Sequence, residues 1–119
     1  MGSVRLNSVM PSMPVSGLDM AVAFYTEKLG FKVTFRNGDL FAIVSRDGVE
    51  IGLAPVAVHK RTPGTGGIYL KASGVDALHT DLVAKGVAML HPLRDEAYGM
   101  REFMIADPDG NTINYGEPC

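Results

Sequence analysis

The sequence predicts an α+β fold made of two βαβββ modules in one chain, because one pattern of residues is used twice. Ser-Gly-Leu-Asp at residues 16–19 recurs as Ser-Gly-Val-Asp at residues 73–76, 57 positions later. The turn Arg-Asp-Gly at 46–48 has its counterpart in Pro-Asp-Gly at 108–110. Two copies of one supersecondary unit meet along a pseudo-twofold axis, so we expect a ligand cleft where the two copies come together.

Each copy begins with a helical pattern. In the first, Ser16 is positioned to cap a helix, with Asp19 as the acidic partner of a capping box. Ser73 and Asp76 repeat this arrangement in the second copy. The helices are expected to end at glycines, and their apolar faces are Leu18, Val22, Tyr25 and Leu29 before Gly30, and Val75, Leu78 and Leu82 before Gly86.

Strand patterns fill the rest of each copy. Alternating or continuous apolar runs bounded by turn residues predict strands at residues 4–15, 31–36, 40–44, 49–53, 68–72, 88–93, 101–106 and 112–115. Asn37 and Gly38 form a strong hairpin signal, while Pro11 and Pro14 confine the first strand to an edge or a hinge. We place module 1 at residues 1–56, a linker at 57–64 and module 2 at 65–119.

Composition and charge restrict the class of protein. A chain of 119 residues with 46% hydrophobic and 20% charged residues is typical of one soluble globular domain. A net charge of −2 without a basic cluster argues against a nucleic-acid partner. The longest apolar run, residues 20–25, is too short to span a membrane, and no secretory signal is visible. Because Cys119 is the only cysteine, no internal disulfide can form, and we expect a cytoplasmic protein.

Alternation along the strands predicts which side chains face away from the helices. Glu50 and Gly52 should lie on that side, with Ile51 facing the helix. The third strand presents either Phe41 and Ile43, or Leu40, Ala42 and Val44. Either choice gives an apolar lining, which indicates that this face is covered by a ligand, a partner chain or both.

These residues resemble the vicinal-oxygen-chelate superfamily, which includes glyoxalase I, bleomycin-resistance proteins, fosfomycin-resistance enzymes and extradiol dioxygenases. The resemblance rests on four motifs, namely Ala-Phe-Tyr at 23–25, Leu-Gly-Phe at 29–31, Gly-Met-Arg-Glu-Phe at 99–103 and Asp-Pro-Asp-Gly-Asn at 107–111. It implies paired βαβββ units whose curved mixed sheets form a cleft, completed by dimerisation. The expected partners are therefore a small-molecule ligand and a second copy of the chain.

Enzymes of this superfamily hold a divalent metal with His, Glu or Gln side chains. The resemblance implies four metal-ligand positions, on the first and fifth strands and on the last strand of each module, and here they are Met10, Gly52, Gly67 and Asn114. Two glycines offer no side chain, and a thioether is too soft for hard divalent ions. We therefore expect no metal and no cofactor.

The run Tyr-Gly-Met-Arg-Glu-Phe at 98–103 is most similar to the bleomycin-resistance branch, whose members hold a drug as non-catalytic dimers. This implies a metal-free, dimeric protein that sequesters a hydrophobic or aromatic small molecule such as an antibiotic. The best-known members are strongly acidic, so a net charge of −2 argues less for bleomycin itself.

The candidate ligand-binding residues are aromatic platforms, pliable methionines and polar groups at the expected cleft. They are Phe41 (or Phe35), Glu50, Tyr69, His91, Tyr98, Met100, Glu102, Met104 and Asn114. The same aromatic side chains could instead fill a dimer core. Arg101 and Asp107 are interpreted as structural, the aspartate as an acceptor for turn amides.

An enzyme remains the alternative. It would be a glyoxalase-like metal-dependent lyase or isomerase, or a dioxygenase, with non-standard ligands. A metal-free acid–base enzyme using Glu50, Glu102 or His91 is a further alternative, although the sequence shows no mutually oriented pair of such groups. We expect no catalytic residue.

Overall fold

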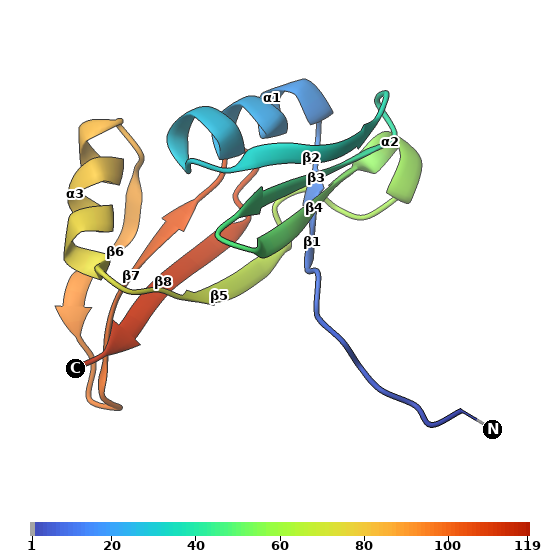
Figure 1. Ribbon diagram of the computed structural model, residues 1–119. Helices are drawn as coiled ribbons and strands as arrows, with labels where there is room; N and C mark the ends of the chain where they lie inside the picture. Colours follow the sequence, from blue (N-terminus) through green and yellow to red (C-terminus); the bar gives the residue numbers. More distant parts are fainter. Residues whose placement is uncertain (1) are drawn as a thin grey trace.

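The computed structural model describes residues 2–119, which form two four-stranded sheets with helices packed on one face of each (Figure 1). Module 1 contains β1 (Ser12–Val15), α1 (Leu18–Ala23), the π-helical turn η1 (Phe24–Lys28), β2 (Lys32–Asn37), β3 (Phe41–Arg46) and β4 (Val49–Pro55). Module 2 contains β5 (Gly67–Lys71), α3 (Val75–Ala84), β6 (Met89–Asp95), β7 (Met100–Ala106) and β8 (Thr112–Pro118).

The two sheets have the same topology. Their strand orders are β1-β4-β3-β2 and β5-β8-β7-β6, and in each the first strand runs parallel to the last. The remaining pairs are antiparallel, so both sheets are mixed. The predicted α+β fold of two βαβββ modules is confirmed.

The hydrophobic core lies between the sheets and their helices and includes side chains of both modules. Its largest fully buried members are Tyr25, Leu29 and Ile51 of module 1 and Phe103 and Leu82 of module 2. Complete burial of one such aliphatic side chain stabilises the fold by about 1.5–3 kcal/mol. Because the cluster is continuous, the two modules share one core.

A buried polar network ties the two modules together at the β7–β8 turn. One carboxylate oxygen of Asp107 accepts hydrogen bonds from the Tyr25 hydroxyl (2.9 Å) and the Asn111 amide (2.8 Å). The other oxygen accepts from the backbone N–H groups of Asp109 and Asn111, which confirms the structural role predicted for this aspartate. The Asn111 side chain also bonds Pro14 O of β1 at 2.8 Å. The turn is therefore fixed to module 1 as well as to its own sheet.

The predicted capping boxes are wrong. The helix N-caps are Gly17 and Gly74, and neither helix has a side-chain cap hydrogen bond from its own serine. Instead, the Glu117 carboxylate of β8 accepts from the N–H groups of Gly74 and Val75. The acids predicted as capping partners form ion pairs with arginines, Asp19 with Arg36 and Asp76 with Arg101. Side chains distant in the sequence therefore take the place of the local capping partners that were predicted.

The first strand is much shorter than predicted. Only residues 12–15 pair with β4, and residues 2–10 extend away from the body as an arm (Figure 1). The last backbone bond before β1 is Gly52 N to Pro11 O (2.8 Å). Val4, Leu6 and Val9 have exposed fractions of 95%, 92% and 83%, so the arm leaves its apolar side chains uncovered within this chain.

Strand β2 also departs from the prediction that one alternating face is buried. Phe31 is buried just before the strand, but a register shift between Val33 and Phe35 moves Phe35 opposite Ile43, on the far side of the sheet. Phe35 is therefore half exposed. A bulge of this kind cannot be predicted from the alternation of apolar and polar residues in the sequence.

Two further helical features were not predicted. The expected helix over 18–29 ends as the π-helical η1, with a backbone bond from Leu29 N to Phe24 O, before Gly30 stops it at a φ of +74°. A short helix, α2 (Val56–His59), begins at the last residue predicted for module 1 and extends into the predicted linker. Within the described chain, none of the helices has the length and hydrophobicity that crossing a membrane would require.

Candidate functional site

The candidate site lies on the outer faces of the sheets, meaning the faces turned away from α1 and α3. In module 1 the register places Phe41 and Ile43 on this face, whereas Ala42 and Val44 are fully buried beneath α1. This decides between the two alternatives left open by the sequence. In module 2, cross-strand register places Tyr69, His91, Glu102, Met104 and Asn114 on one face.

Two tyrosines converge on one carboxylate in module 2, and we call Tyr69, Tyr98 and Glu102 the tyrosine–glutamate cluster. The hydroxyls of Tyr98 (2.5 Å) and Tyr69 (3.1 Å) both donate to Oε1 of Glu102. Tyr69 comes from β5, Glu102 from β7 and Tyr98 from the β6–β7 turn. Sequence analysis predicted all three as site residues, but not that they would be bonded together.

The cluster changes the acidity of its phenols. The hydrogen bond to Glu102, followed by partial desolvation, raises the pKa of Tyr98 to about 12. Desolvation, followed by the bond to Glu102, raises the pKa of Tyr69 as well. Both phenols therefore stay protonated at neutral pH and donate to the carboxylate. Oε2 of Glu102 makes no hydrogen bond within residues 2–119.

Glycines let aromatic rings lie flat across both outer faces. A Cβ on Gly116 of β8 would collide with the hydroxyl end of Tyr69. In module 1, a Cβ on Gly52 would lie 2.7 Å from Cζ of Phe41. The Phe41 ring also packs on His59 of α2, with 5.7 Å between ring centroids. Because Gly52 and Gly116 have no side chain, each outer face can present an aromatic surface.

The other predicted residues surround the cluster or lie apart from it. His91 is opposite Met104 and Met104 is opposite Asn114, so these three form a row across β6, β7 and β8. Met100 lies at the start of β7, and Glu50 is exposed on β4. No hydrogen bond or ring contact of the described residues joins Phe41 or Glu50 to the module 2 cluster.

Arg94 was missed as a site residue. It lies beyond the strand expected over residues 88–93, yet β6 continues to Asp95 and places Arg94 opposite Glu102. Arg94 Nε lies 2.5 Å from Oε1 of Glu96. This ion pair holds the Arg94 guanidinium beside the tyrosine–glutamate cluster. Two register shifts in β6 hid its face from a simple alternation rule.

The four positions expected to hold a metal do not fit one. The Phe41 ring covers Gly52, and the Thr112 hydroxyl lies 2.8 Å from where a Cβ of Gly67 would be. Met10 belongs to the arm and not to the first strand, so its predicted strand position is wrong. Throughout residues 2–119, no group of three His, Cys, Asp or Glu side chains is placed to hold a metal ion. Of the four positions, only Asn114 carries an oxygen ligand, and one such ligand is not enough to hold a divalent ion.

The cavity and the candidate site residues lie on different faces of the chain. A cavity of about 650 Å³ lies on the helical side between the modules, and its lining includes none of the predicted site residues. The outer faces are open surfaces. We base the candidate site on the bonded cluster and exposed aromatic rings, because a cleft shared between two chains would not be enclosed in one.

Comparison with known proteins identifies the family of the chain. Residues 5–115 match the sequence model described as the Glyoxalase/Bleomycin resistance protein/Dioxygenase superfamily. The chain belongs to this superfamily. It is 28% identical to the bleomycin resistance protein of Geobacillus stearothermophilus, over 89% of this chain and 92% of that protein.

Solved structures of the glyoxalase/bleomycin resistance superfamily superpose over nearly the whole chain. TnmS3, an antibiotic binding protein from Streptomyces sp. CB03234, has a TM-score of 0.85 at 27% identity, covering 98% of this chain and all of that one. The bleomycin-binding protein of Streptomyces verticillus, solved with copper(II)-bleomycin, has a TM-score of 0.80 at 24% identity, covering 95% and 97%. The second comparison supports the fold alone.

Proposed function

We propose that this chain is a ligand-binding protein that sequesters a hydrophobic or aromatic small molecule, such as an antibiotic, without converting it. The tyrosine–glutamate cluster carries this proposal. Its two phenol rings give a planar ligand surfaces to stack on, and such contacts add about 0.5–1.5 kcal/mol each beyond burial. The free Oε2 of Glu102 can accept a hydrogen bond from a cationic or amide group of the ligand.

The similarity to a bleomycin resistance protein and to an antibiotic binding protein supports the same ligand class. Sequestration needs tight binding and no chemistry. Protection is then stoichiometric, because each bound drug molecule occupies one site.

The binding unit we propose is a homodimer. Phe35 (50% exposed), Tyr69 (40%) and Tyr98 (66%) leave large apolar surfaces uncovered on the outer faces. The arm adds Val4 and Leu6, both almost fully exposed. A second copy could cover these surfaces and place the module 1 face of one chain over the module 2 face of its partner. Two equivalent clefts would result.

Titration calorimetry against a panel of aromatic peptide and glycopeptide antibiotics tests the proposal. We expect saturable binding by at least one member with one site per chain. Glu102→Gln should weaken binding of a cationic member about tenfold, because a charge-assisted bond is lost. Glu27→Gln is the matched control, since Glu27 is exposed on the helical side and should leave affinity unchanged. Absence of saturable binding across the panel would refute sequestration.

The alternative is a glyoxalase-like, metal-dependent enzyme of the same superfamily. The side chains at the four expected metal positions argue against it. Elemental analysis of the purified protein after dialysis distinguishes the two. A divalent ion retained at one per chain and lost on substitution of Asn114 by alanine would favour the enzyme.

A further inference from the structure

The cavity of about 650 Å³ on the helical side has features of a separate binding site. It lies between the β3–β4 hairpin of module 1 and the start of α3 in module 2. Its apolar lining includes Val49, Leu70 and Leu78, and its polar lining includes Arg46 and Tyr115. None of these residues belongs to the outer faces, so a ligand here would not compete directly with one on the tyrosine–glutamate cluster.

The cavity exists because the two junctions between the modules are not equivalent. At the β7–β8 turn, Asp107 and Asn111 close the junction through the bonds to Tyr25 and Pro14. The internal repeat places Ser45 and Val49 at the positions of Asp107 and Asn111, and Leu82 at that of Tyr25. These residues cannot build the same network. Of the hydrogen bonds within residues 2–119, none joins the β3–β4 hairpin to residues 70–81.

Tyr115 leaves an unsatisfied polar atom at this cavity. The residue is only 4% exposed, its ring stacks on Phe103, and its hydroxyl has no hydrogen-bond partner within residues 2–119. Buried hydroxyls are nearly always paired in folded proteins, so an unpaired one needs an explanation. Burial raises the pKa of Tyr115 to about 12, so the hydroxyl remains a donor at neutral pH.

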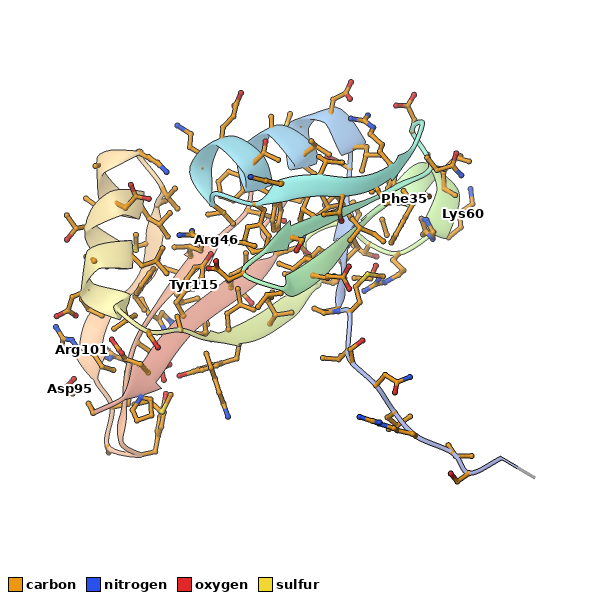
Figure 2. The ribbon with its side chains drawn as sticks, in the orientation of Figure 1. Phe35, Arg46, Lys60, Asp95, Arg101 and Tyr115 are labelled. Atoms are coloured by element: carbon orange, nitrogen blue, oxygen red, sulfur yellow. The ribbon has the colours of Figure 1, made fainter. Side chains whose placement is uncertain are left out.

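Arg46 supplies a positive charge beside this hydroxyl. The two side chains project into the space between α3 and the β3–β4 hairpin (Figure 2), and the charge of Arg46 lowers the pKa of Tyr115 against the effect of burial. Arg46 Nη1 donates to Leu29 O at 2.8 Å, and Nη2 has no hydrogen bond within the described residues.

Both acids at the rim are paired with a base. Asp81 forms an ion pair with Lys85 at 3.1 Å, and Asp47 forms one with Nε of Arg46 at 3.7 Å, which leaves Nη2 of Arg46 without a hydrogen-bond partner in the described part of the chain. Lys71 also lines the cavity and forms no ion pair in the described part of the chain. The Tyr115 hydroxyl and Nη2 of Arg46 are therefore donors without partners within residues 2–119, which favours a ligand that carries an acceptor group.

We propose that this cavity is a second binding site, for a small organic monocarboxylate with an apolar body. The carboxylate would accept hydrogen bonds from the Tyr115 hydroxyl and from the free edge of the Arg46 guanidinium, whose planar donors match carboxylate geometry. The apolar body would pack against Val49, Leu70 and Leu78. The site is independent of the proposed antibiotic-binding function and stands or falls separately.

Octanoate is a suitable probe, with octanol and octylamine as matched ligands that lack the carboxylate. Calorimetry combined with amide chemical-shift mapping should show saturable octanoate binding and shifts centred on residues 70–78. Tyr115→Phe and Arg46→Met should each weaken it about tenfold, since each removes a charge-assisted hydrogen bond. Octanol and octylamine should bind at least about tenfold more weakly than octanoate for the same reason.

Two alanines on α3 provide a matched pair of variants. Ala77 is exposed and lines the cavity, so Ala77→Phe should block octanoate without disturbing the core. Ala84 is exposed on the same helix but outside the cavity, so Ala84→Phe should bind as the parent does. Glu102→Gln should also leave octanoate binding unchanged. Failure of octanoate to bind, equal binding by the Tyr115, Arg46 and Ala77 variants, or shifts on the outer faces would overturn the proposal.

Discussion

The Tyr25 hydroxyl donates to the Asp107 carboxylate at 2.9 Å, across 82 positions of sequence, and so joins η1 of module 1 to the β7–β8 turn of module 2. Both residues are buried, and the carboxylate accepts three further hydrogen bonds. A single network thus sets how the two modules are placed. The outer faces with the candidate site and the inter-module cavity both depend on that placement.

Loss of this bond should destabilise the protein. Tyr25→Phe leaves a buried carboxylate oxygen with one partner fewer, and we expect the free energy of unfolding to fall by about 1–3 kcal/mol. Urea unfolding followed by circular dichroism measures the change. Tyr98→Phe removes an exposed hydroxyl and should have little effect on stability. Equal stability of the Tyr25 variant and the parent would show that the network does not hold the modules.

Alkaline pH should unfold the protein. Burial, followed by the charge of Asp107, raises the pKa of Tyr25, and burial raises that of Tyr115, each from 10.0. A folded pKa above the unfolded value means that the folded state binds the proton more tightly. The stabilisation is therefore complete below the unfolded pKa of 10.0 and is lost as the pH rises above it.

Thermal unfolding at about pH 8 and about pH 11 measures this dependence. The melting temperature of the parent should fall between the two values. The double variant Tyr25→Phe/Tyr115→Phe should show a smaller fall, although it starts from a lower melting temperature. A fall as large as that of the parent would assign the alkaline sensitivity to other groups.

The sequence predicted the element order well because the repeat constrains it twice. The helices begin where the two copies of Ser-Gly-x-Asp place them, and the observed bounds differ from the expected ones by one residue for β7 and by three for β8. The capping partners were not predictable. Glu117 and Asp109 act from strands and turns that are distant in sequence, and only the folded arrangement brings them to Gly74 and Ser16.

The candidate site was predicted as a set of residues and not as an arrangement. Alternation identified Tyr69 and Glu102 on one face, because β5 and β7 pair regularly with β8. It failed for Phe35, since a bulge in β2 reverses the face, and it was not applied to Arg94, which lies beyond the strand expected over 88–93 but within β6. The bonds within the cluster depend on the β6–β7 turn that carries Tyr98, whose path alternation does not describe.

Gly116→Ala should disable the cluster while the fold persists. The added methyl group collides with the end of Tyr69 and must displace it from Glu102. We expect ligand affinity to fall about tenfold, as for a lost charge-assisted bond, with little change in circular dichroism. Gly17→Ala is the control, because nothing lies within 4 Å of its new Cβ. An unchanged affinity for the Gly116 variant would remove Tyr69 from the site.

The arm should contribute to self-association. Replacing Val4, Leu6 and Val9 by serine removes three exposed apolar side chains without touching the core of the chain. Sedimentation velocity should show a dimer for the parent and a dimer dissociation constant at least about tenfold higher for the triple variant, given about 0.8 kcal/mol per buried methylene. A monomeric parent at all concentrations would contradict the dimer that we propose.

Metal removal should leave ligand binding intact. Dialysis against EDTA should change the affinity for the bound antibiotic by less than about twofold, because residues 2–119 contain no group of three His, Cys, Asp or Glu side chains placed to hold a metal ion. The matched control is the same titration after dialysis without EDTA. Loss of binding that zinc, nickel or manganese restores would contradict a metal-free site.

Chemical-shift mapping with a saturating aromatic antibiotic tests the central claim most directly, since it locates the ligand on the protein. We predict that the largest amide shifts fall on β5, β7 and the β6–β7 turn around Tyr69, Glu102 and Tyr98, and that Glu102→Gln reduces them. Saturable binding whose shifts leave these residues unchanged would contradict the assignment of the tyrosine–glutamate cluster as the ligand site.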